Sequence, residues 1–412
     1  MSFEETCPME ERVRMLSDWD SGNWNVAELC RRYGVCRDTF YTWRARRASG
    51  ESAWFVDRSH AARHCPQRSA AGVAAAVVAL RRRFPYLGPR KLLALLARDA
   101  PARRWPAAST IGEILKRAGL VAPARRRRRA LDQARPFAAV GAANDEWAAD
   151  FKGWFRTQDQ RRIDPLTVSD SHSRLLIEVR ITAPTIAGVQ PVLEAAFRAH
   201  GLPRAIRCDN GPPFGSAGAG GLTRLSAWWL KLGIEPRFIR PGAPQDNGRH
   251  ERMHRTLKAQ TSRPPAATAA AQQARFDAFR RHYNHERPHE ALGQRPPAAL
   301  YAPSPRALPE RVADPWYDAD HEVRRVHGSG EVRWRGRPVF VSEALAGELV
   351  GIAELDTGDQ VVRFCGHDLG LIDRAARFHR FAPPRPGLRE AAEPDTKLST
   401  IVPVQNVDHQ TG

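Results

Sequence analysis

The stretch "PGAPQDNGRHERMHRTLK", residues 241–258, joins a loop rich in Gly and Pro to a basic segment of helical character. Asp246 or Asn247 can cap this helix, which places Glu251 in its first two turns. The segment also spells H-E-x-x-H at 250–254. In that pattern two histidines one helical turn apart bind zinc, and the glutamate acts as the general base of a metalloprotease. The acidic residues elsewhere in the chain indicate which metal ion Glu251 would bind.

The charge distribution indicates a basic front end on a chain of several domains. The chain has 412 residues, is 42% hydrophobic and carries a formal net charge of +19. Residues 1–135 account for +14 of this charge, with 27 Arg/Lys against 13 Asp/Glu. A basic third of this kind favours nucleic acid as the partner. A solvated basic surface is the alternative.

Other classes of protein are disfavoured. The chain has no run of 18 or more apolar residues, so neither a membrane span nor a membrane partner is expected. The acidic, polar first segment is not typical of a signal peptide. The six cysteines are scattered without a C-x-x-C pair, which argues against a zinc knuckle or a disulfide framework. We therefore expect a reduced, cytoplasmic protein.

The segment "NVAELCRRYGVCRDTFYTWRARR", residues 25–47, has the spacing of a helix-turn-helix unit. Asn25 can cap a first helix, Gly34 suits a left-handed turn residue, and a second helix follows from about Arg37. An arginine-rich helix after a short glycine turn is typical of entry into a DNA major groove, with a plain three-helix bundle as the alternative.

A second helix-turn-helix pattern follows further along the chain, and a basic linker comes after it. Helices are expected at 71–85, 87–100 and 106–120, and residues 123–135 include five consecutive arginines. Such a run stays solvated or follows phosphates. The basic residues expected to contact DNA in this part of the chain are Arg37, Arg44, Arg46, Lys116, Arg117, Arg125, Arg126, Arg127, Arg128 and Arg129.

From residue 144 the pattern changes to alternating strands and helices, which favours a mixed α/β layer with helices covering a sheet. Asp150 lies on the first strand (146–155) and Asp209 at the end of the fourth. If those strands are neighbours, both carboxylates can converge with Glu251. Three convergent carboxylates suit Mg²⁺. Two such ions clamp the attacking and leaving oxygens of an in-line phosphoryl transfer. The remaining expected elements are strands within 164–182 and 204–214 and helices at 186–201 and 222–233.

Four motifs in order, "WAADFKGWF", "IRCDNGPPF", the opening stretch, and "YNHERPHEALGQRPPAALY" (283–301), resemble the catalytic core of the DDE transposase and retroviral integrase superfamily. The likeness is greatest to bacterial insertion-sequence transposases. It covers residues 141–302 and, less fully, the helix-turn-helix segments. The resemblance implies a ribonuclease H-like fold, in which an acidic triad holds two Mg²⁺ (or Mn²⁺) ions. By it the triad is Asp150, Asp209 and Glu251, and Lys258 and Arg255 contact DNA.

The resemblance also implies a function. It predicts a nucleoid-associated DNA transposase that binds the terminal inverted repeats of an insertion sequence and performs strand cleavage and transfer. Its partners would be the double-stranded element ends, the target DNA, and at least a second copy of the chain. One alternative is a catalytically inactive, transposase-derived DNA-binding regulator. The remote alternative is the zinc protease, disfavoured because the helix is basic and no downstream third ligand stands out. We expect the metal ligands to be carboxylates, not His250 or His254.

Two features depart from the family or extend beyond its core. Asp209 and Glu251 are separated by 41 residues, longer than is typical, and we expect the surplus in a flexible loop at 215–221. Short strands over 322–380, with a turn at Asp356-Thr357-Gly358, predict a small β-barrel. The expected organisation is a helix-turn-helix domain at 1–50, a linker at 51–68, a second helix-turn-helix domain at 69–122, a basic linker at 123–140, the α/β catalytic core at 141–302, a small β-barrel-like domain at 303–380 and a disordered tail at 381–412.

Overall fold

A computed structural model describes residues 7–58, 68–121, 140–239 and 248–381. The chain divides into two compact units, 1–70 and 71–412. None of the helices in the described ranges is long and apolar enough to cross a membrane. Residues 382–412 of the tail expected at 381–412, and the arginine run at 125–129, lie outside the described residues.

The first unit is a small helical bundle of the helix-turn-helix kind. The Asn25 side chain accepts a hydrogen bond from the backbone N–H of Glu28 at 3.0 Å, and Gly34 has φ of 62°, as the sequence predicts. The buried seam is apolar and includes Leu29, Phe40 and Trp43. Its helices are α1 (Pro8–Asp20), α2 (Val26–Tyr33) and α3 (Arg37–Ala48).

A second three-helix bundle opens the larger unit. Pro89 occupies the first turn of its middle helix, where the missing N–H costs no hydrogen bond. Apolar residues of all three helices, among them Val77, Leu92 and Ile111, form one core. The helices are α4 (Ala71–Arg83), α5 (Pro89–Asp99) and α6 (Ala108–Arg117).

A five-stranded mixed sheet lies at the centre of the larger unit, in the order β5-β4-β1-β6-β7. Strands β1, β4 and β5 form an antiparallel meander, whereas β6 and β7 run parallel to β1. The first strand ends at Phe151, earlier than the expected 155, and its residues Glu146–Ala149 are all buried because helices cover both faces of the sheet. The strands are β1 (Glu146–Phe151), β4 (Pro165–Asp170), β5 (Leu176–Ile181), β6 (Ala205–Cys208) and β7 (Glu235–Phe238); the short pair β2 (Phe155–Arg156) and β3 (Arg162–Ile163) follows β1.

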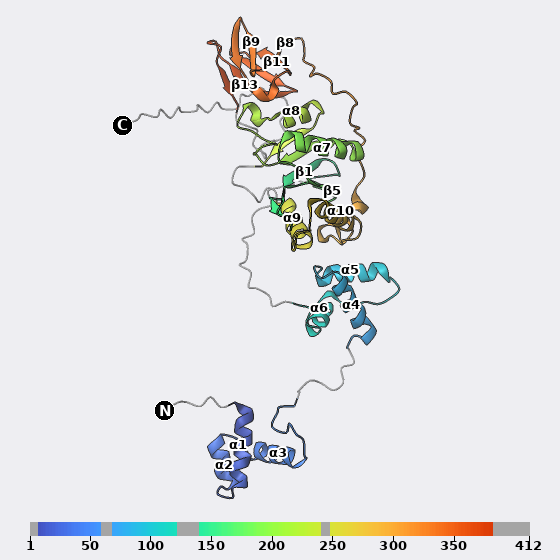
Figure 1. The fold of residues 1–412 in the computed structure, drawn as a ribbon, viewed down its shortest axis with the longest axis vertical. Coiled ribbons are helices and arrows are strands. Elements are labelled where there is room, and N and C mark those ends of the chain that lie inside the picture. Colours follow the sequence, from blue (N-terminus) through green and yellow to red (C-terminus); the bar gives the residue numbers. More distant parts are fainter. Residues whose placement is uncertain (1–6, 59–67, 122–139, 240–247, 382–412) are drawn as a thin grey trace, which may run out of the picture. The chain divides into compact units, whose positions relative to one another are not determined.

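Two pairs of helices enclose this sheet (Figure 1). Helices α7 (Ile186–His200) and α8 (Arg224–Lys231) pack Leu193, Phe197 and Trp229 against one face. Helices α9 (Gly248–Thr261) and α10 (Ala269–His285) pack on Leu176 and Val179 of β5, chiefly through Met253, Leu257, Phe276 and Phe279. The catalytic helix predicted from the sequence, α9, is therefore fixed to the sheet by its apolar side.

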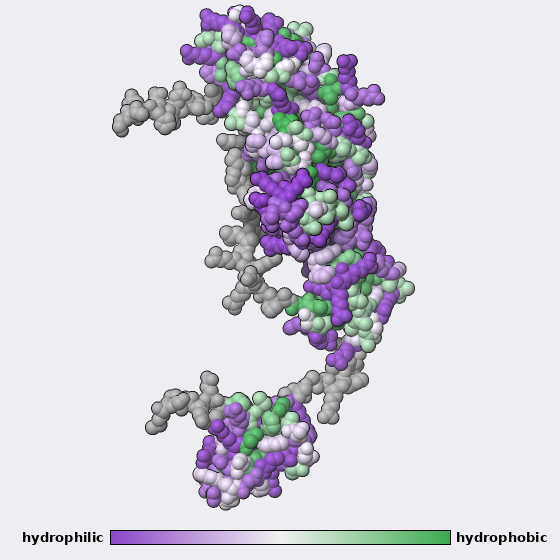
Figure 2. Space-filling view, viewed as in Figure 1, coloured by the Kyte–Doolittle hydropathy of each residue, from purple (hydrophilic) through white to green (hydrophobic). Residues whose placement is uncertain are grey.

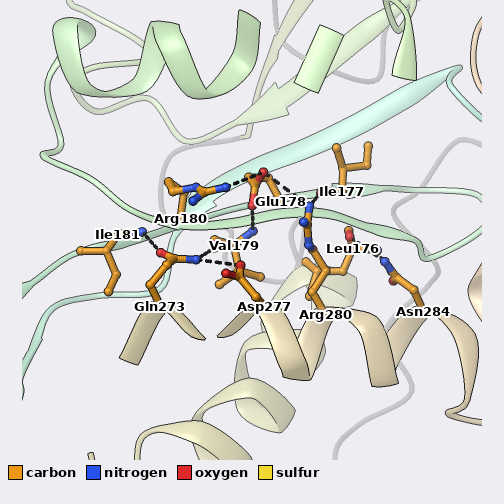
Figure 3. Close-up of polar contacts among 10 residues, drawn as sticks. All are labelled: Leu176, Ile177, Glu178, Val179, Arg180, Ile181, Gln273, Asp277, Arg280 and Asn284. Carbon is orange, nitrogen blue, oxygen red and sulfur yellow. Dashed lines mark hydrogen bonds and ion pairs between the residues drawn. The ribbon is translucent and has the colours of Figure 1, made fainter. Parts of the chain in front are cut away.

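Helix α10 also satisfies the free edge of β5 (Figure 3). Asn284 accepts a hydrogen bond from the Leu176 N–H at 2.8 Å and donates one to the Leu176 carbonyl at 2.9 Å. Gln273 bonds the Ile181 N–H and the Val179 carbonyl in the same way, at 2.9 and 2.8 Å. Side-chain amides thus replace a sixth strand, which protects an edge that would otherwise pair with another chain.

The C-terminal part is a strand-rich domain. A five-stranded antiparallel sheet, β14-β13-β12-β11-β8, packs with the hairpin β9-β10 around one apolar core. The expected barrel is therefore two sheets around a shared core, without a continuous ladder among the described strands. The turn at Gly358, with φ of 80°, joins β11 to β12 as predicted. The strands are β8 (His321–Arg325), β9 (Glu331–Trp334), β10 (Arg337–Phe340), β11 (Leu349–Glu354), β12 (Gln360–Phe364), β13 (His367–Ile372) and β14 (Phe378–Arg380).

The surplus segment between Asp209 and Glu251 is not a flexible loop. The Ser216 hydroxyl donates to the Leu222 carbonyl at 2.6 Å, and a short 3₁₀ turn, η1 (Ala219–Gly221), follows. Ala219 and Leu222 are buried in the core of the C-terminal domain, together with Leu230 of α8. The segment is ordered because it provides the surface on which that domain packs.

Candidate active site

Two of the predicted carboxylates lie on adjacent parallel strands. In the β1–β6 register Ala148 is opposite Arg207. Asp150, near the end of β1, comes two residues after Ala148. Asp209, directly after β6, comes two residues after Arg207. Because parallel neighbours advance together, the register brings these two side chains to the same edge of the sheet. The neighbouring first and fourth strands expected from the sequence are confirmed.

The third predicted carboxylate comes from α9. Glu251 lies in the first turn of that helix and is exposed. The pKa of Asp150 is raised to about 7, first by burial and then by the negative charges of Asp209 and Glu251. Repulsion of this kind acts between carboxylates within electrostatic range, so Glu251 lies in the neighbourhood of the two strand carboxylates. Among the described residues, however, the group whose ligand atoms all lie within 4.8 Å of one another is Asp150 with His250 and His254, so a triad of Asp150, Asp209 and Glu251 stays a prediction.

The chemistry of this group fits a divalent cation. Among the described residues, Oδ1 of Asp209 is a buried oxygen without a hydrogen-bond partner, and burial raises the pKa of that carboxyl. A buried acceptor that lacks a donor and a neighbouring carboxyl with a pKa of about 7 both gain from a positive ion. Oxygen ligands of this type suit Mg²⁺ or Mn²⁺.

Two imidazoles lie beside Asp150. His250 and His254 are buried, and their ring centroids are 4.6 Å apart. Both Nε2 atoms lie 2.6 Å from the hydroxyl oxygen of Thr167 on β4, and Nδ1 of His250 lies 2.9 Å from the Ser169 hydroxyl. Burial lowers the pKa of His250 to about 3 and that of His254 to about 2, so both rings are neutral. The sequence offered no third partner for this pair, but the structure supplies Asp150.

Asp170 has a structural role, in line with its omission from the predicted ligands. Its carboxylate accepts hydrogen bonds from the backbone N–H groups of Asn144 and Ser173, at 2.8 and 2.6 Å, and from the Ser173 hydroxyl at 2.7 Å. The side chain is buried and thereby joins the β4–β5 turn to the start of β1.

Cationic side chains border the acidic site. Arg255 and Lys258 are exposed on α9, and Figure 2 shows a mainly hydrophilic surface over this helix. Lys152, which follows β1, was not predicted as a site residue. Burial lowers its pKa, and the charge of Lys258 lowers it further, while Asp150 acts in the opposite direction. Lys152 therefore lies close to both; its place two residues after Asp150 was the signal in the sequence.

The predicted DNA contacts of the front end differ in their surroundings. Arg37 is exposed at the start of α3. Arg44 and Arg46 also lie over aromatic rings of their own unit: Arg44 is 4.6 Å from the ring centroid of Trp19, and Arg46 is 4.5 Å from that of Trp43. The remaining two described candidates, Lys116 and Arg117, are exposed at the end of α6.

A mixed five-stranded sheet between two helical layers, with carboxylates gathered at one edge, defines a core of the integrase type. Comparison with known proteins agrees. The Integrase core domain family matches residues 141–244 and 232–297, and the Winged helix-turn helix family matches residues 12–71.

Two relatives are encoded by insertion elements. A 39.2 kDa protein of element IS476 from Xanthomonas euvesicatoria is 32% identical over 245 residues, which are 58% of this chain and 68% of the relative. A 31.7 kDa protein of element IS407 from Burkholderia multivorans is 30% identical, over 54% of this chain and 76% of the relative. A simian T-cell lymphotropic virus intasome is similar in structure over 75% of this chain and 100% of its own, at 17% identity and a TM-score of 0.35. The chain belongs to the bacterial insertion-sequence transposases of the DDE transposase and integrase superfamily.

Proposed function

We propose that the chain is an active DNA transposase that binds the terminal inverted repeats of its element and catalyses metal-dependent strand cleavage and strand transfer. The observation that carries this proposal is that Asp150 on β1 and Asp209 directly after β6 lie at one edge of the sheet, where the charge of Glu251 on α9 also acts on Asp150. Their mutual repulsion has a cost in a metal-free protein, and it is useful in a site that binds cations.

In this proposal the three carboxylates hold two Mg²⁺ (or Mn²⁺) ions, which neutralise charge on the attacking and leaving oxygens. Asp150 and Asp209 act from strands of a packed sheet, so their positions are fixed before DNA arrives. Water attacks phosphorus at the element end and releases a DNA 3′-hydroxyl. That 3′-oxygen then attacks a target phosphodiester and breaks its bond to the target 3′-oxygen. Lys152, Arg255 and Lys258 pair with DNA phosphates around the site.

Sequence recognition is assigned to residues 1–122, because two helix-turn-helix units can occupy successive major-groove sites. The arginines at 125–129 would add affinity for any sequence, since phosphate contacts carry no base information. One core holds one triad, whereas joining an element requires two processed ends. The active species is therefore proposed to be at least a dimer on paired ends and target DNA. Light scattering tests this: a single chain that performs paired-end transfer would contradict it.

The central test is an in vitro strand-transfer assay on the element's own ends. Asp150→Asn should abolish transfer and leave end binding intact, whereas an intact wild-type chain that binds the ends but never cuts them would favour the DNA-binding regulator. Asp170→Asn serves as the control for loss of a strand carboxylate outside the triad.

A further inference from the structure

One assignment of the hydrogens satisfies every group around the Thr167 hydroxyl. In it the hydroxyl donates its one hydrogen to the backbone carbonyl of Asp150, which lies 3.0 Å away and can only accept. Its oxygen can then only accept from His250 and His254, whose Nε2 atoms both lie at 2.6 Å. Each imidazole therefore carries its hydrogen on Nε2. A neutral imidazole has only one N–H, so both Nδ1 atoms present lone pairs.

The two Nδ1 atoms have different surroundings. Nδ1 of His250 lies 2.9 Å from the Ser169 hydroxyl, which can donate to it. Nδ1 of His254 lies 4.0 Å from Oδ2 of Asp150. An imidazole lone pair and a carboxylate oxygen at this separation are too far apart for a direct hydrogen bond, which needs about 2.7–3.2 Å. Both are electron-pair donors, so a positive ion between them could bind to both.

The separation suits one metal ion. Metal–nitrogen and metal–oxygen bonds are about 2.0–2.2 Å long, so donors as far as roughly 4.2 Å apart can share an ion, and a tetrahedral ion brings them to about 3.4 Å. We propose that Nδ1 of His254 and the carboxylate of Asp150 bind one divalent cation together, with His250 holding Thr167 and hence the His254 ring in place. The proposal rests on the proposed function only in sharing Asp150 with the triad.

A nitrogen ligand changes which cations this position favours. Carboxylates alone accept Mg²⁺ readily, whereas imidazole adds affinity for Mn²⁺, Co²⁺ and above all Zn²⁺. One histidine of the H-E-x-x-H pattern then binds metal, although the protein is not a protease. His254 is the ligand, and His250 orients it. This departs from the expectation that neither histidine binds metal. Full-length protein should bind Zn²⁺ more tightly than Mg²⁺ at the Asp150 position.

The test is direct measurement of metal binding by metal-free, full-length protein. Pulsed electron paramagnetic resonance of one bound Mn²⁺ should show modulation by a ¹⁴N nucleus. His254→Gln keeps an N–H near Thr167 but removes the Nδ1 lone pair, so the modulation should vanish. In titration calorimetry its Zn²⁺ affinity should fall at least tenfold (about 1.4 kcal/mol), with Mg²⁺ affinity changed less than threefold.

His285→Gln, at an exposed histidine of α10, is the matched control and should retain both the ¹⁴N signal and Zn²⁺ binding. Absence of ¹⁴N modulation in the wild-type protein would overturn the proposal, as would an unchanged ¹⁴N signal in His254→Gln. Circular dichroism and end-DNA binding confirm that each variant is folded. Strand transfer is scored separately: a His254-dependent metal signal in a protein that never cuts DNA would refute the proposed function while supporting this one.

Discussion

Replacing Asp150 by Asn should stabilise the metal-free protein while removing its response to metal. The pKa of Asp150 is raised from 3.8 to about 7, chiefly by burial and then by Asp209. A carboxyl whose folded-state pKa exceeds its unfolded value releases its proton more easily on unfolding. The folded state therefore loses stability as the pH rises from about 4 to about 7, and the loss is complete above the folded pKa. Asn carries no charge and avoids this cost.

The shift sets the size of the effect. A difference of about three pKa units corresponds to about 4 kcal/mol at 1.36 kcal/mol per unit, an upper limit. The Asp150 side chain keeps 23% of its surface exposed, so water screens part of the cost and about 1–3 kcal/mol is expected at pH 8. At about 2–4 °C per kcal/mol, the melting temperature should rise by several degrees. At pH 4 the difference should nearly vanish.

The assay is scanning calorimetry of full-length protein in EDTA, at pH 8 and pH 4, followed by Mg²⁺ addition at pH 8. Wild type should gain thermal stability with Mg²⁺ and the Asn variant should gain little. Asp170→Asn is the matched control with the opposite sign. Its carboxylate accepts three hydrogen bonds, so loss of one acceptor should cost about 1–3 kcal/mol. If Asp150→Asn melts below wild type at pH 8 in EDTA, the reasoning from burial and repulsion is wrong.

Three further outcomes are expected. Asp209→Asn and Glu251→Gln should each reduce strand transfer to background with end binding unchanged in gel shifts; near-normal transfer by the Gln variant would remove Glu251 from the triad. Asn284→Ala should lower the unfolding free energy by about 2–4 kcal/mol in urea, because both backbone groups of Leu176 lose their partner. Arg281→Ala, at an exposed position of the same helix, should change it by less than about 0.5 kcal/mol; equal losses would contradict this. Mg²⁺ affinity, measured by calorimetry, should fall up to about tenfold per pH unit below pH 7, because the cation must displace the Asp150 proton; a flat profile would contradict the assignment.

The sequence predicted the parts of the site that short motifs encode. Asp150 lies within one strand-forming segment and Asp209 ends another, and adjacency of those strands, which only the fold could establish, places them together. Glu251 followed from its place near the start of a helix, whose predicted cap at Asp246 or Asn247 lies outside the described residues. The helix-turn-helix unit was equally local, since Asn25 and Gly34 determine its cap and turn.

The role of the histidines could not be read in the same way. A search for a third ligand after H-E-x-x-H finds none, because the partner, Asp150, lies far upstream on β1. The hydrogen positions depend on Thr167 of β4, which no spacing rule connects to α9. Lys152 was missed for a related reason. It is a site residue because it lies close to Asp150 and Lys258, and Lys258 is distant from it in the sequence. The site consists of residues from β1, β4 and α9, and only the folded sheet brings these elements together.

Composition was misleading where glycines serve packing. The sequence "GSAGAGG" indicates flexibility, yet Gly220 has φ of 62°, and a Cβ there would lie 3.2 Å from Leu369 of the C-terminal domain. A small residue is needed at Gly220 because its backbone adopts a left-handed conformation and lies close to the Leu369 side chain. Lys231 of α8 strengthens the same junction through an ion pair with Glu348 at 2.8 Å. The extra length between Asp209 and Glu251 thus carries the docking surface for residues 321–380. The predicted domain boundary after residue 302 stays a prediction. One apolar core contains residues from both sides of it, among them Leu222 and Leu369. The strand-rich domain therefore stabilises the segment of the chain between Asp209 and Glu251.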